Sequence, residues 1–525
     1  MGMLSLKRLM STRQRERRRR RRHKVQVRNG SIPSMSKAKK DNSRPGKRFR
    51  DSWPNLPADI WCNIHSLMPM QDSARAACVS RAFLHSWKRH PNLILTKETL
   101  GLKQNACGKG DIARAFTSKV DQILKNHSGT GVKTLELDIF DCRDLDTCYL
   151  NNWLQIAITP GIENITLWLP LKYRESYTFP CSLLFGGNGS SIRHLHLTYC
   201  AFRPTIGIGC LRSLTNLYLH DVHITGEQLG CLLSNSFALK KLELIFCDEI
   251  ICLKIPCMLE RLSWLTVSYC RMLQMIESKA PNLSTIYFDG DLVQLSLGQS
   301  LQVKNLDMRC SNNTNFLCYA ITKLPYIVPN LETLTLSSIS ERINTPVVAA
   351  KFLHLKYLEF FLDGDLSPGY DYLSLVSFLD ASPVLETFIL GVNQGYMEFD
   401  SIFGDASHMR QMSEHKHDSL KDVTIFGFCS AKSMVELTCH ILENATSLEC
   451  ITLDSVFDAN DKDDMGRCSV TSARKTGECS RLTNQMIMEA NRGLMAIERY
   501  IVGKVPSTVK LDVRGPCSWC HTLEL

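Results

Sequence analysis

The stretch from Leu239 to Cys270 reads LKKLELIFCDEIICLKIPCMLERLSWLTVSYC. Within it, the pattern L-x-x-L-x-L-x-x-C begins at Leu239 and returns at Leu262 with valine as its third apolar residue. Apolar residues that alternate with polar ones are typical of a strand with one buried face. A return of the same pattern at a short interval indicates one structural unit per copy, which cannot bury its apolar face alone. The stretch therefore predicts stacked copies of a strand and a return segment.

Thirteen copies of this pattern run along the chain at intervals of about 20 to 35 residues, which is the leucine-rich-repeat signature. The first apolar residues of the copies are Val132, Ile162, Ile192, Leu214, Leu239, Leu262, Leu283, Val303, Leu331, Leu355, Leu385, Leu420 and Leu448. We expect an α/β solenoid whose parallel strands form a concave face and whose leucines form one continuous core. Cys200, Cys247 and Cys270 occupy the repeat's own cysteine position, so burial explains them without redox chemistry.

Ahead of the repeats, Trp53 to Leu95 reads WPNLPADIWCNIHSLMPMQDSARAACVSRAFLHSWKRHPNLIL. Pro57 suits the first position of a helix, and Pro69 ends that helix. Asp72 is the expected N-cap of a second helix. The residues that share one face of the first helix are Leu56, Ile60, Ile64 and Leu67; those that recur every four residues in a third helix are Val79, Phe83 and Trp87. Three short helices that expose this much apolar surface need a partner, the repeats, or both.

These residues resemble an F-box, and together with the repeats the chain resembles the F-box/leucine-rich-repeat proteins of grasses. The resemblance implies that the segment docks a Skp-type adaptor and, through it, a cullin. The residues that carry this role would be Leu56, Pro57, Ile60, Ile64, Leu67, Met70, Val79, Ser80 and Arg81. Phe83 stands where many F-boxes have tryptophan. The segment from Gly493 to His521 is similar to the C-terminal region of the same proteins. The plainer alternative is a helical hairpin that caps the repeats.

The first 50 residues carry 19 Lys and Arg against two acidic residues, a net charge of +17, whereas the remainder has a net charge of −7. A basic run of this kind cannot fold alone. Its core is predicted as a nuclear import signal: Arg17, Arg18, Arg19, Arg20, Arg21, Arg22 and Lys24. The alternatives are an arm that attracts nucleic acid, an organellar transit peptide, or a solvated tail. If Met35 is the true start, the residues before it are not translated.

No apolar run is long enough to cross a membrane, and no secretory signal is recognisable, so the 22 cysteines are expected as reduced thiols. Residues 400–419, with His408, His415 and His417, read as a polar surface loop, with a metal site as the alternative. Residues 455–480 read as a mobile loop. Cys517 and Cys520, followed by His521, have the spacing of half a zinc site, but no second cysteine pair stands nearby.

A target is expected on the concave face, where side chains alternate with the buried leucines. The predicted contacts are Tyr218, Glu243, Trp264, Tyr287, Asp289, Asp307, Tyr357 and Glu359. Aromatic anchors in an acidic field would suit a basic protein segment. Acidic residues that serve only solubility are the alternative.

The sequence thus predicts a disordered basic tail (1–52), a three-helix F-box (53–95), a repeat solenoid (96–470) and a helix–strand cap (471–525). No catalytic, phosphate-binding or cofactor motif occurs, so we expect a non-enzymatic substrate receptor of an SCF-type ubiquitin ligase in nucleus and cytoplasm. Its partners would be the adaptor, a cullin and a protein target, with nucleic acid only through the tail and no membrane. The alternatives are a repeat scaffold without a ligase, a nucleic-acid-associated factor, and a small-molecule receptor.

Overall fold

The structure is a computed structural model, and Met1–Leu56 and Pro57–Leu525 are two separate units of it. It describes residues 56–102, 109–128, 131–142, 145–184, 188–204, 211–298, 302–313, 315–339, 341–346, 349–363, 370–393, 399–404, 409–410, 415–457 and 482–517. The predicted basic tail, its nuclear import residues, His408, Cys520, His521 and most of the predicted loop at 455–480 lie outside these residues.

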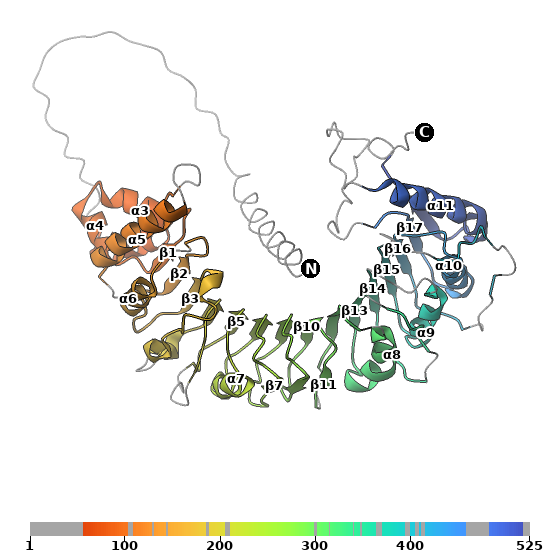
Figure 1. Ribbon diagram of the computed structural model, residues 1–525, viewed down its shortest axis with the longest axis horizontal. Coiled ribbons are helices and arrows are strands. Elements are labelled where there is room, and N and C mark those ends of the chain that lie inside the picture. The colour runs from red at the N-terminus through yellow and green to blue at the C-terminus, as the bar shows by residue number, and fades with distance from the viewer. Residues whose placement is uncertain are drawn as a thin grey trace, which may run out of the picture. The chain divides into compact units, whose positions relative to one another are not determined.

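Every one of the thirteen repeats found in the sequence supplies a strand to one parallel sheet of 15 strands. The strands in spatial order are β1 Asn92–Leu95, β2 Thr134–Asp138, β3 Asn164–Trp168, β4 His194–Thr198, β5 Asn216–His220, β6 Lys241–Ile245, β8 Trp264–Ser268, β10 Thr285–Gly290, β12 Asn305–Cys310, β13 Thr333–Ser338, β14 Tyr357–Leu362, β15 Thr387–Val392, β16 Asp422–Phe426, β17 Cys450–Asp454 and β18 Lys510–Arg514. Within the second unit these strands line the inner side of a curve (Figure 1). The predicted α/β repeat solenoid with parallel strands is confirmed.

In about half of the described connections between neighbouring strands of the large sheet, an α-helix returns the chain (Figure 1). These helices are α5 Lys109–Asn126, α6 Thr147–Ala157, α7 Gly226–Leu233, α8 Phe316–Ile327, α9 Val376–Asp380, α10 Lys432–Asn444 and α11 Asn484–Tyr500, with short 3-10 turns η1 Leu171–Tyr173, η2 Cys181–Leu184, η3 Asn188–Ser191, η4 Tyr372–Leu375 and η5 Val502–Lys504. In the shortest repeats the return segment is a strand instead. The three strands β7 Cys252–Ile255, β9 Met275–Ser278 and β11 Gln294–Ser296 form a second parallel sheet, which the sequence analysis did not foresee.

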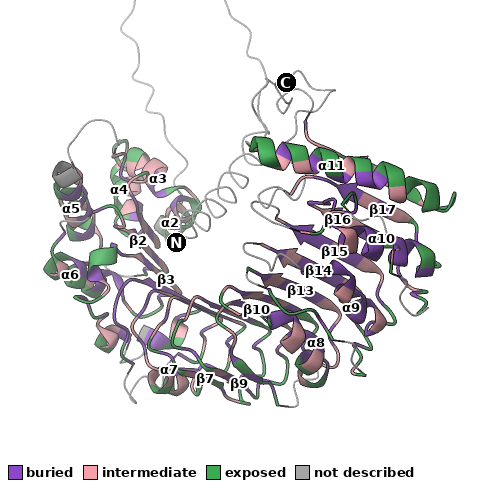
Figure 2. Cartoon of the chain, turned by 45° about the vertical axis from the view of Figure 1, so that its right-hand side comes forward, coloured by how far each residue is buried: buried purple, intermediate pink, exposed green. Residues whose placement is uncertain are grey.

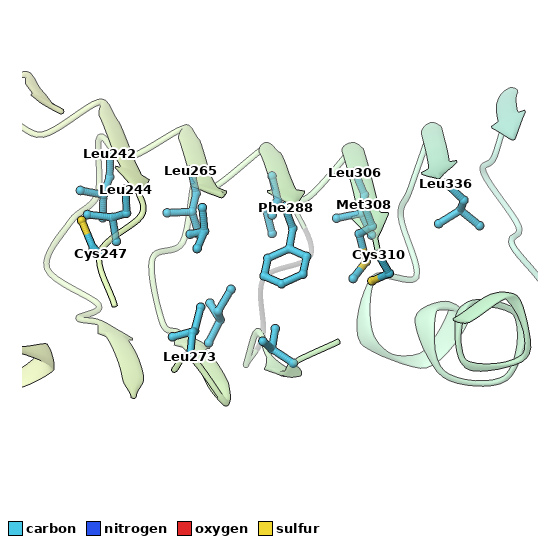
Figure 3. Packing of buried hydrophobic residues seen from close by; sticks show 14 of the residues in the cluster. Leu242, Leu244, Cys247, Leu265, Leu273, Phe288, Leu306, Met308, Cys310 and Leu336 are labelled. Atoms are coloured by element: carbon cyan, nitrogen blue, oxygen red, sulfur yellow. The ribbon is translucent and has the colours of Figure 1, made fainter. Parts of the chain in front are cut away.

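The repeat leucines form the core between the inner sheet and the outer layer. Figure 3 shows Leu242 of β6, Leu265 of β8 and Leu306 of β12 pointing into this space, with Cys247 and Cys310 on the same side. These side chains are at most 1% exposed. Because adjacent strands pair in register, Leu242 beside Leu265 and Leu306 beside Leu334, each leucine contacts its equivalent in the next repeat. The core therefore runs unbroken along the array, as Figure 2 shows by the buried strands.

Three helices precede the first strand: α2 Ala58–Ser66, α3 Met70–Ala77 and α4 Arg81–Trp87. Pro57 is the N-cap of α2, and its carbonyl accepts the N–H groups of Ile60 and Trp61. The prediction that Asp72 caps the second helix is wrong. Pro69 is the N-cap of α3, and Asp72 lies in its first turn, where its carboxylate faces Arg75 at 2.9 Å.

Strand β1 was not predicted, since Asn92–Leu95 was read as the end of the helical segment. Leu93 and Leu95 are fully buried, and they pair in register with Leu135 and Leu137 of β2. The sheet thus begins directly after the three helices. At the other end, β18 pairs with β17 and completes the sheet after α11.

Candidate functional site

Two surfaces of the second unit carry the residues singled out from the sequence: the apolar face of the three N-terminal helices and the concave face of the sheet. On the first surface, Leu67 is 87% exposed and Val79 is 73% exposed. Ile60 and Ile64 are each more than one third exposed, and Leu56, the last residue of the first unit, is exposed as well. We call Ile60, Ile64, Leu67 and Val79 the apolar helix face. A monomer that leaves this much aliphatic surface in water is typically completed by a partner.

The remaining predicted adaptor contacts differ in how exposed they are. Pro57 and Arg81 are exposed, and Ser80 is half-buried with its carbonyl accepting the N–H of Leu84 at the start of α4. Met70 is a correction, because only 5% of it is exposed and it belongs to the continuous core. As the first residue of α3 it lies on the side of that helix that meets β1, so it anchors the helix instead of presenting a contact.

The aromatic residue that departs from the common F-box pattern has a local explanation. The ring of Phe83 lies 4.7 Å from that of Trp61 and 5.0 Å from that of His65, both on α2. His65 is 2% exposed, and burial lowers its pKa, with nearby His90 acting in the same direction. Trp61 therefore supplies aromatic volume from the neighbouring helix at the place where Phe83 is smaller than tryptophan.

Hydrogen bonds fix the three helices to the first repeat. The amide of Gln71 on α3 donates to the carbonyls of Glu98 and Thr99 at 2.6 and 2.7 Å. Asn92 of β1 donates to the carbonyl of Ser66 at the end of α2. These contacts join α2 to the first residue of β1 and α3 to the turn that follows β1. The apolar helix face therefore has a defined position relative to the first strands of the sheet.

On the concave face, the acidic residues are less exposed than the alternation pattern predicted. Glu243, Asp289 and Glu359 are only 6 to 7% exposed, so their prediction as open contacts needs correction. Neighbouring strands lie about 4.8 Å apart, which lets long side chains from adjacent strands cover them. Side chains on the same strand cover them as well: Lys241 approaches Glu243, two places along β6, at 3.5 Å.

The covering side chains are aromatic and cationic. The ammonium of Lys241 lies over the rings of Tyr218 and Trp264 at 5.3 and 5.2 Å, a geometry that cation–π attraction stabilises. Trp264 is 41% exposed, and its indole N–H donates to Thr266 at 2.8 Å. Glu359 accepts the hydroxyls of Tyr357 and Thr335 at 3.1 and 3.2 Å. The predicted residues of this face thus contact one another through cation–π contacts, ion pairs and hydrogen bonds within the protein.

In the centre of the concave face, Asp289, Asp307 and Arg309 lie on adjacent strands with Tyr287. Arg309 meets Asp307 at 3.4 Å and lies over the Tyr287 ring at 5.3 Å. Burial raises the pKa of Asp289, while hydrogen bonds from Tyr269 and Tyr287 and the charge of Arg309 act in the opposite direction. Two carboxyl groups share one guanidinium here.

A row of aromatic rings along the ends of strands β4 to β8 was missed by the sequence analysis. The rings of His220, Phe246 and Tyr269 stack at 5.7 and 5.0 Å, and Tyr199 continues the row at 5.5 Å. Tyr199, Phe246 and Tyr269 have φ of 50 to 55°. Each directly precedes a cysteine of the repeat pattern, Cys200, Cys247 or Cys270; that aromatic–cysteine pair was the available signal.

The expectation of a plain surface loop is wrong for one of the histidines at 400–419. His417 is 8% exposed, and its Nε2 lies 3.4 Å from Nε2 of His440 on α10 and 3.9 Å from Asp380. Burial, with the charges of His440 and His415, lowers the pKa of His417 to about 4. His415 remains exposed. Within the described ranges, no three His, Cys, Asp or Glu side chains are placed to hold a metal ion. None of the helices in those ranges could span a bilayer.

Comparison with known proteins finds a match for each of the two parts of the chain. The family model for the At1g61320/AtMIF1 LRR domain matches residues 123–518, and the F-box domain model matches residues 53–95. The F-box protein At5g03100 of Arabidopsis thaliana is 23% identical over 298 residues, which cover 54% of this chain and 88% of that protein. F-box/LRR-repeat protein At5g02910 is 23% identical over 71% of this chain and 83% of its own length. F-box/FBD/LRR-repeat protein At1g13570 is 22% identical over 78% and 92%; both come from the same plant.

Proposed function

Because this chain belongs to the plant F-box/leucine-rich-repeat proteins, we propose that it is the substrate-recognition subunit of an SCF-type cullin–RING ubiquitin ligase. The F-box docks a Skp-type adaptor and, through it, a cullin, and the concave face binds a protein target. The observation that carries the proposal is the apolar helix face, which is exposed on helices that are fixed to the repeats.

In this proposal the chain acts by holding a target protein close to the ubiquitin carrier. The ligase's other subunits supply the charged ubiquitin carrier, and this chain contributes no reacting group. Holding a target beside that carrier raises the effective concentration of the target's lysines, which can replace much of the entropic cost of a bimolecular encounter. The hydrogen bonds from α3 and β1 across the joint favour this role, because they keep the adaptor-binding face and the first repeats in one geometry.

Co-purification tests the proposal. The full chain, expressed with a Skp-type adaptor and a cullin, should form a stable complex and support ubiquitination of proteins captured by the concave face. Failure to retain the adaptor under conditions in which another F-box protein retains it would refute the ligase role. A repeat protein that binds its targets without a ligase would then be the remaining function.

We further propose that the chain works in nucleus and cytoplasm, with Arg17 to Arg22 and Lys24 as the import signal. Deleting Met1 to Arg50 should move a fluorescently tagged chain from the nucleus to the cytoplasm, and adaptor binding should not change. Import of the full chain into plastids or mitochondria would contradict this proposal.

A further inference from the structure

The aromatic row at the ends of the strands leads directly into the acidic centre of the concave face. We call Tyr199, His220, Phe246 and Tyr269 the aromatic row, and Asp289, Asp307 and Arg309 the acidic end. The row lies at the ends of β4, β5, β6 and β8, and the acidic end lies on β10 and β12, the next two strands of the same sheet. Tyr269 joins the two parts, because its hydroxyl hydrogen-bonds Asp289.

The backbone explains how these rings come to lie side by side. In each of three repeats the cysteine turns inward, and the aromatic residue before it adopts the left-handed region. The N–H of Phe246 donates to the carbonyl of Ser268 in the next repeat, as the N–H of Tyr199 donates to that of His220. Parallel pairing is thereby extended past the strand ends, and the rings repeat at the spacing of the strands. His220, Phe246 and Tyr269 are half-buried, so part of each side chain remains exposed, whereas Tyr199 is buried.

The acidic end has more negative than positive charge. Asp307 and Arg309 keep 29% and 43% of their side chains exposed, whereas Asp289 is buried beneath them. Asp291, which follows β10, is exposed, accepts a hydrogen bond from Asn312 at 2.7 Å and adds a third carboxylate to this repeat. A cation from outside would therefore find a favourable potential here, and a carboxylate or phosphate would meet like charge.

We propose that this strip of the concave face binds an extended target segment in which apolar or aromatic side chains are followed, on one fixed side, by a lysine or arginine. The apolar side chains lie on the aromatic row, and the basic side chain lies at Asp307 above Asp289. The inference rests on the proposed function, because it names the class of target that the receptor takes.

The dimensions of the strip set the length of the segment. Strands about 4.8 Å apart place β5 and β12, four steps along the sheet, about 19 Å from each other. An extended chain rises about 3.3 Å per residue, so about six residues cover this distance. An apolar residue at Phe246 or Tyr269 would thus stand about three to five residues from the basic one.

Selection from a synthetic library of randomised decapeptides, with the full chain in complex with its adaptor as bait, tests this inference. We expect enrichment of Phe, Trp or Leu with Lys or Arg three to five positions away on one side. Enrichment of acidic peptides, or no positional preference, would overturn it. Adaptor binding is measured separately, so a failed selection by an adaptor-bound chain rejects the inference and leaves the proposed function standing.

Variants then assign the two parts of the strip, with the best selected peptide as the probe. Asp289→Asn with Asp307→Asn should weaken that peptide at least tenfold, and selection with this variant should lose the basic residue but keep the apolar ones. Phe246→Gly with Tyr269→Gly removes two rings at positions where glycine adopts the same backbone without strain, and it should abolish the apolar preference.

Asp422→Asn is the matched control, because Asp422 is an exposed carboxylate on the same face at β16, away from the strip. It should leave peptide affinity unchanged. A circular-dichroism spectrum and a melting temperature that match those of the parent chain show that the array of each variant is folded, and retention of the adaptor shows that its F-box is. Equal loss in the control and the strip variants, or no loss in either strip variant, would place recognition elsewhere and overturn the proposal.

Discussion

The F-box exposes apolar side chains, whereas the repeat array buries charged ones. The F-box leaves Leu67 and Val79 largely in water, whereas the array buries carboxylates as well as leucines, with Glu341 and Asp454 fully enclosed. A segment that exposes aliphatic side chains is incomplete without a partner. An array that encloses charged groups has already provided hydrogen bonds for most of them. The two modules therefore differ in where their stability comes from, and substitutions can separate them.

The largest expected effect is on the array core. Phe360 is fully buried between Phe378 and Phe388, at ring distances of 5.0 and 6.0 Å. Phe360→Ala should lower the free energy of unfolding by about 3–5 kcal/mol, since it removes a large side chain from a close-packed site. Urea unfolding followed by circular dichroism measures the loss. An effect below about 1 kcal/mol would mean that this part of the array repacks freely.

On the F-box the same kind of change should affect binding and leave stability alone. Leu67→Asp with Val79→Asp should weaken adaptor binding by about 3 kcal/mol, roughly a hundredfold, because both side chains leave an interface centre. The melting temperature should not change, because both residues are already solvent-exposed. Isothermal titration with the adaptor and a thermal melt give the two numbers.

Leu171→Asp is the control for that experiment, because Leu171 is 59% exposed on the array, outside the F-box. It should change neither measurement. If Leu171→Asp weakened adaptor binding as strongly, the contrast between the two modules would fail.

A buried carboxyl group gives the array a pH dependence that the apolar helix face lacks. Burial raises the pKa of Glu341 from 4.5 to about 7, although Ser338 and the N–H groups of Leu317 and Phe316 hydrogen-bond it. The folded state therefore holds a proton that the unfolded state releases at lower pH. The stability that this group contributes is complete below pH 4.5 and is lost as the pH rises through 7.

The expected loss between pH 5 and pH 8 is roughly 2–3 kcal/mol. Glu341→Gln keeps an acceptor for the N–H of Leu317 and should flatten this part of the stability profile. Urea unfolding at several pH values compares the two chains. Parallel profiles for the variant and the parent would show that Glu341 does not titrate in this range.

The smallest effect concerns an ion pair that holds a connecting segment on the array. Arg410 binds Asp371 through two bonds of 2.7 and 2.8 Å and Glu436 at 2.6 Å. Half of Arg410 is exposed, but Glu436 is enclosed. Arg410→Ala should cost roughly 1–2 kcal/mol, because it leaves an enclosed carboxylate without its cation.

Lys421→Ala, which removes an exposed pair with Glu386 at 3.1 Å, should cost less than about 0.5 kcal/mol. Hydrogen exchange of α10 amides in both variants measures the difference. Equal protection in the two variants would show that burial of Glu436 does not strengthen the Arg410 contact.

Much of the array could be predicted because one physical requirement repeats in the sequence. Alternating leucines mark each strand by the face that it buries, which is why all thirteen repeats became strands. Strand β1 escaped because Asn92–Leu95 offers only Leu93 and Leu95, without the leading leucine of the pattern. The three-stranded outer sheet escaped for a similar reason, since its strands of three or four residues are too short to show a period.

The concave face was predictable in position but not in exposure. Alternation correctly placed Glu243, Asp289 and Glu359 on the side opposite the leucines. It could not show that Lys241 or Tyr357 would lie across them, because alternation gives the face on which a side chain lies but not its direction along that face. Met70 shows the converse, since its inward direction depends on where α3 meets β1.

The three short return strands have a mechanical consequence for the middle of the array. A helix keeps successive repeats farther apart on the outer side than strands can, because helices pack 8–10 Å apart and hydrogen-bonded strands about 4.8 Å apart. Where β7, β9 and β11 hold the outer side at the same spacing as the inner sheet, bending would stretch or compress two hydrogen-bonded ladders at once. We therefore expect this stretch, which carries Tyr269 and Asp289, to resist bending more than the repeats whose return segments are helices.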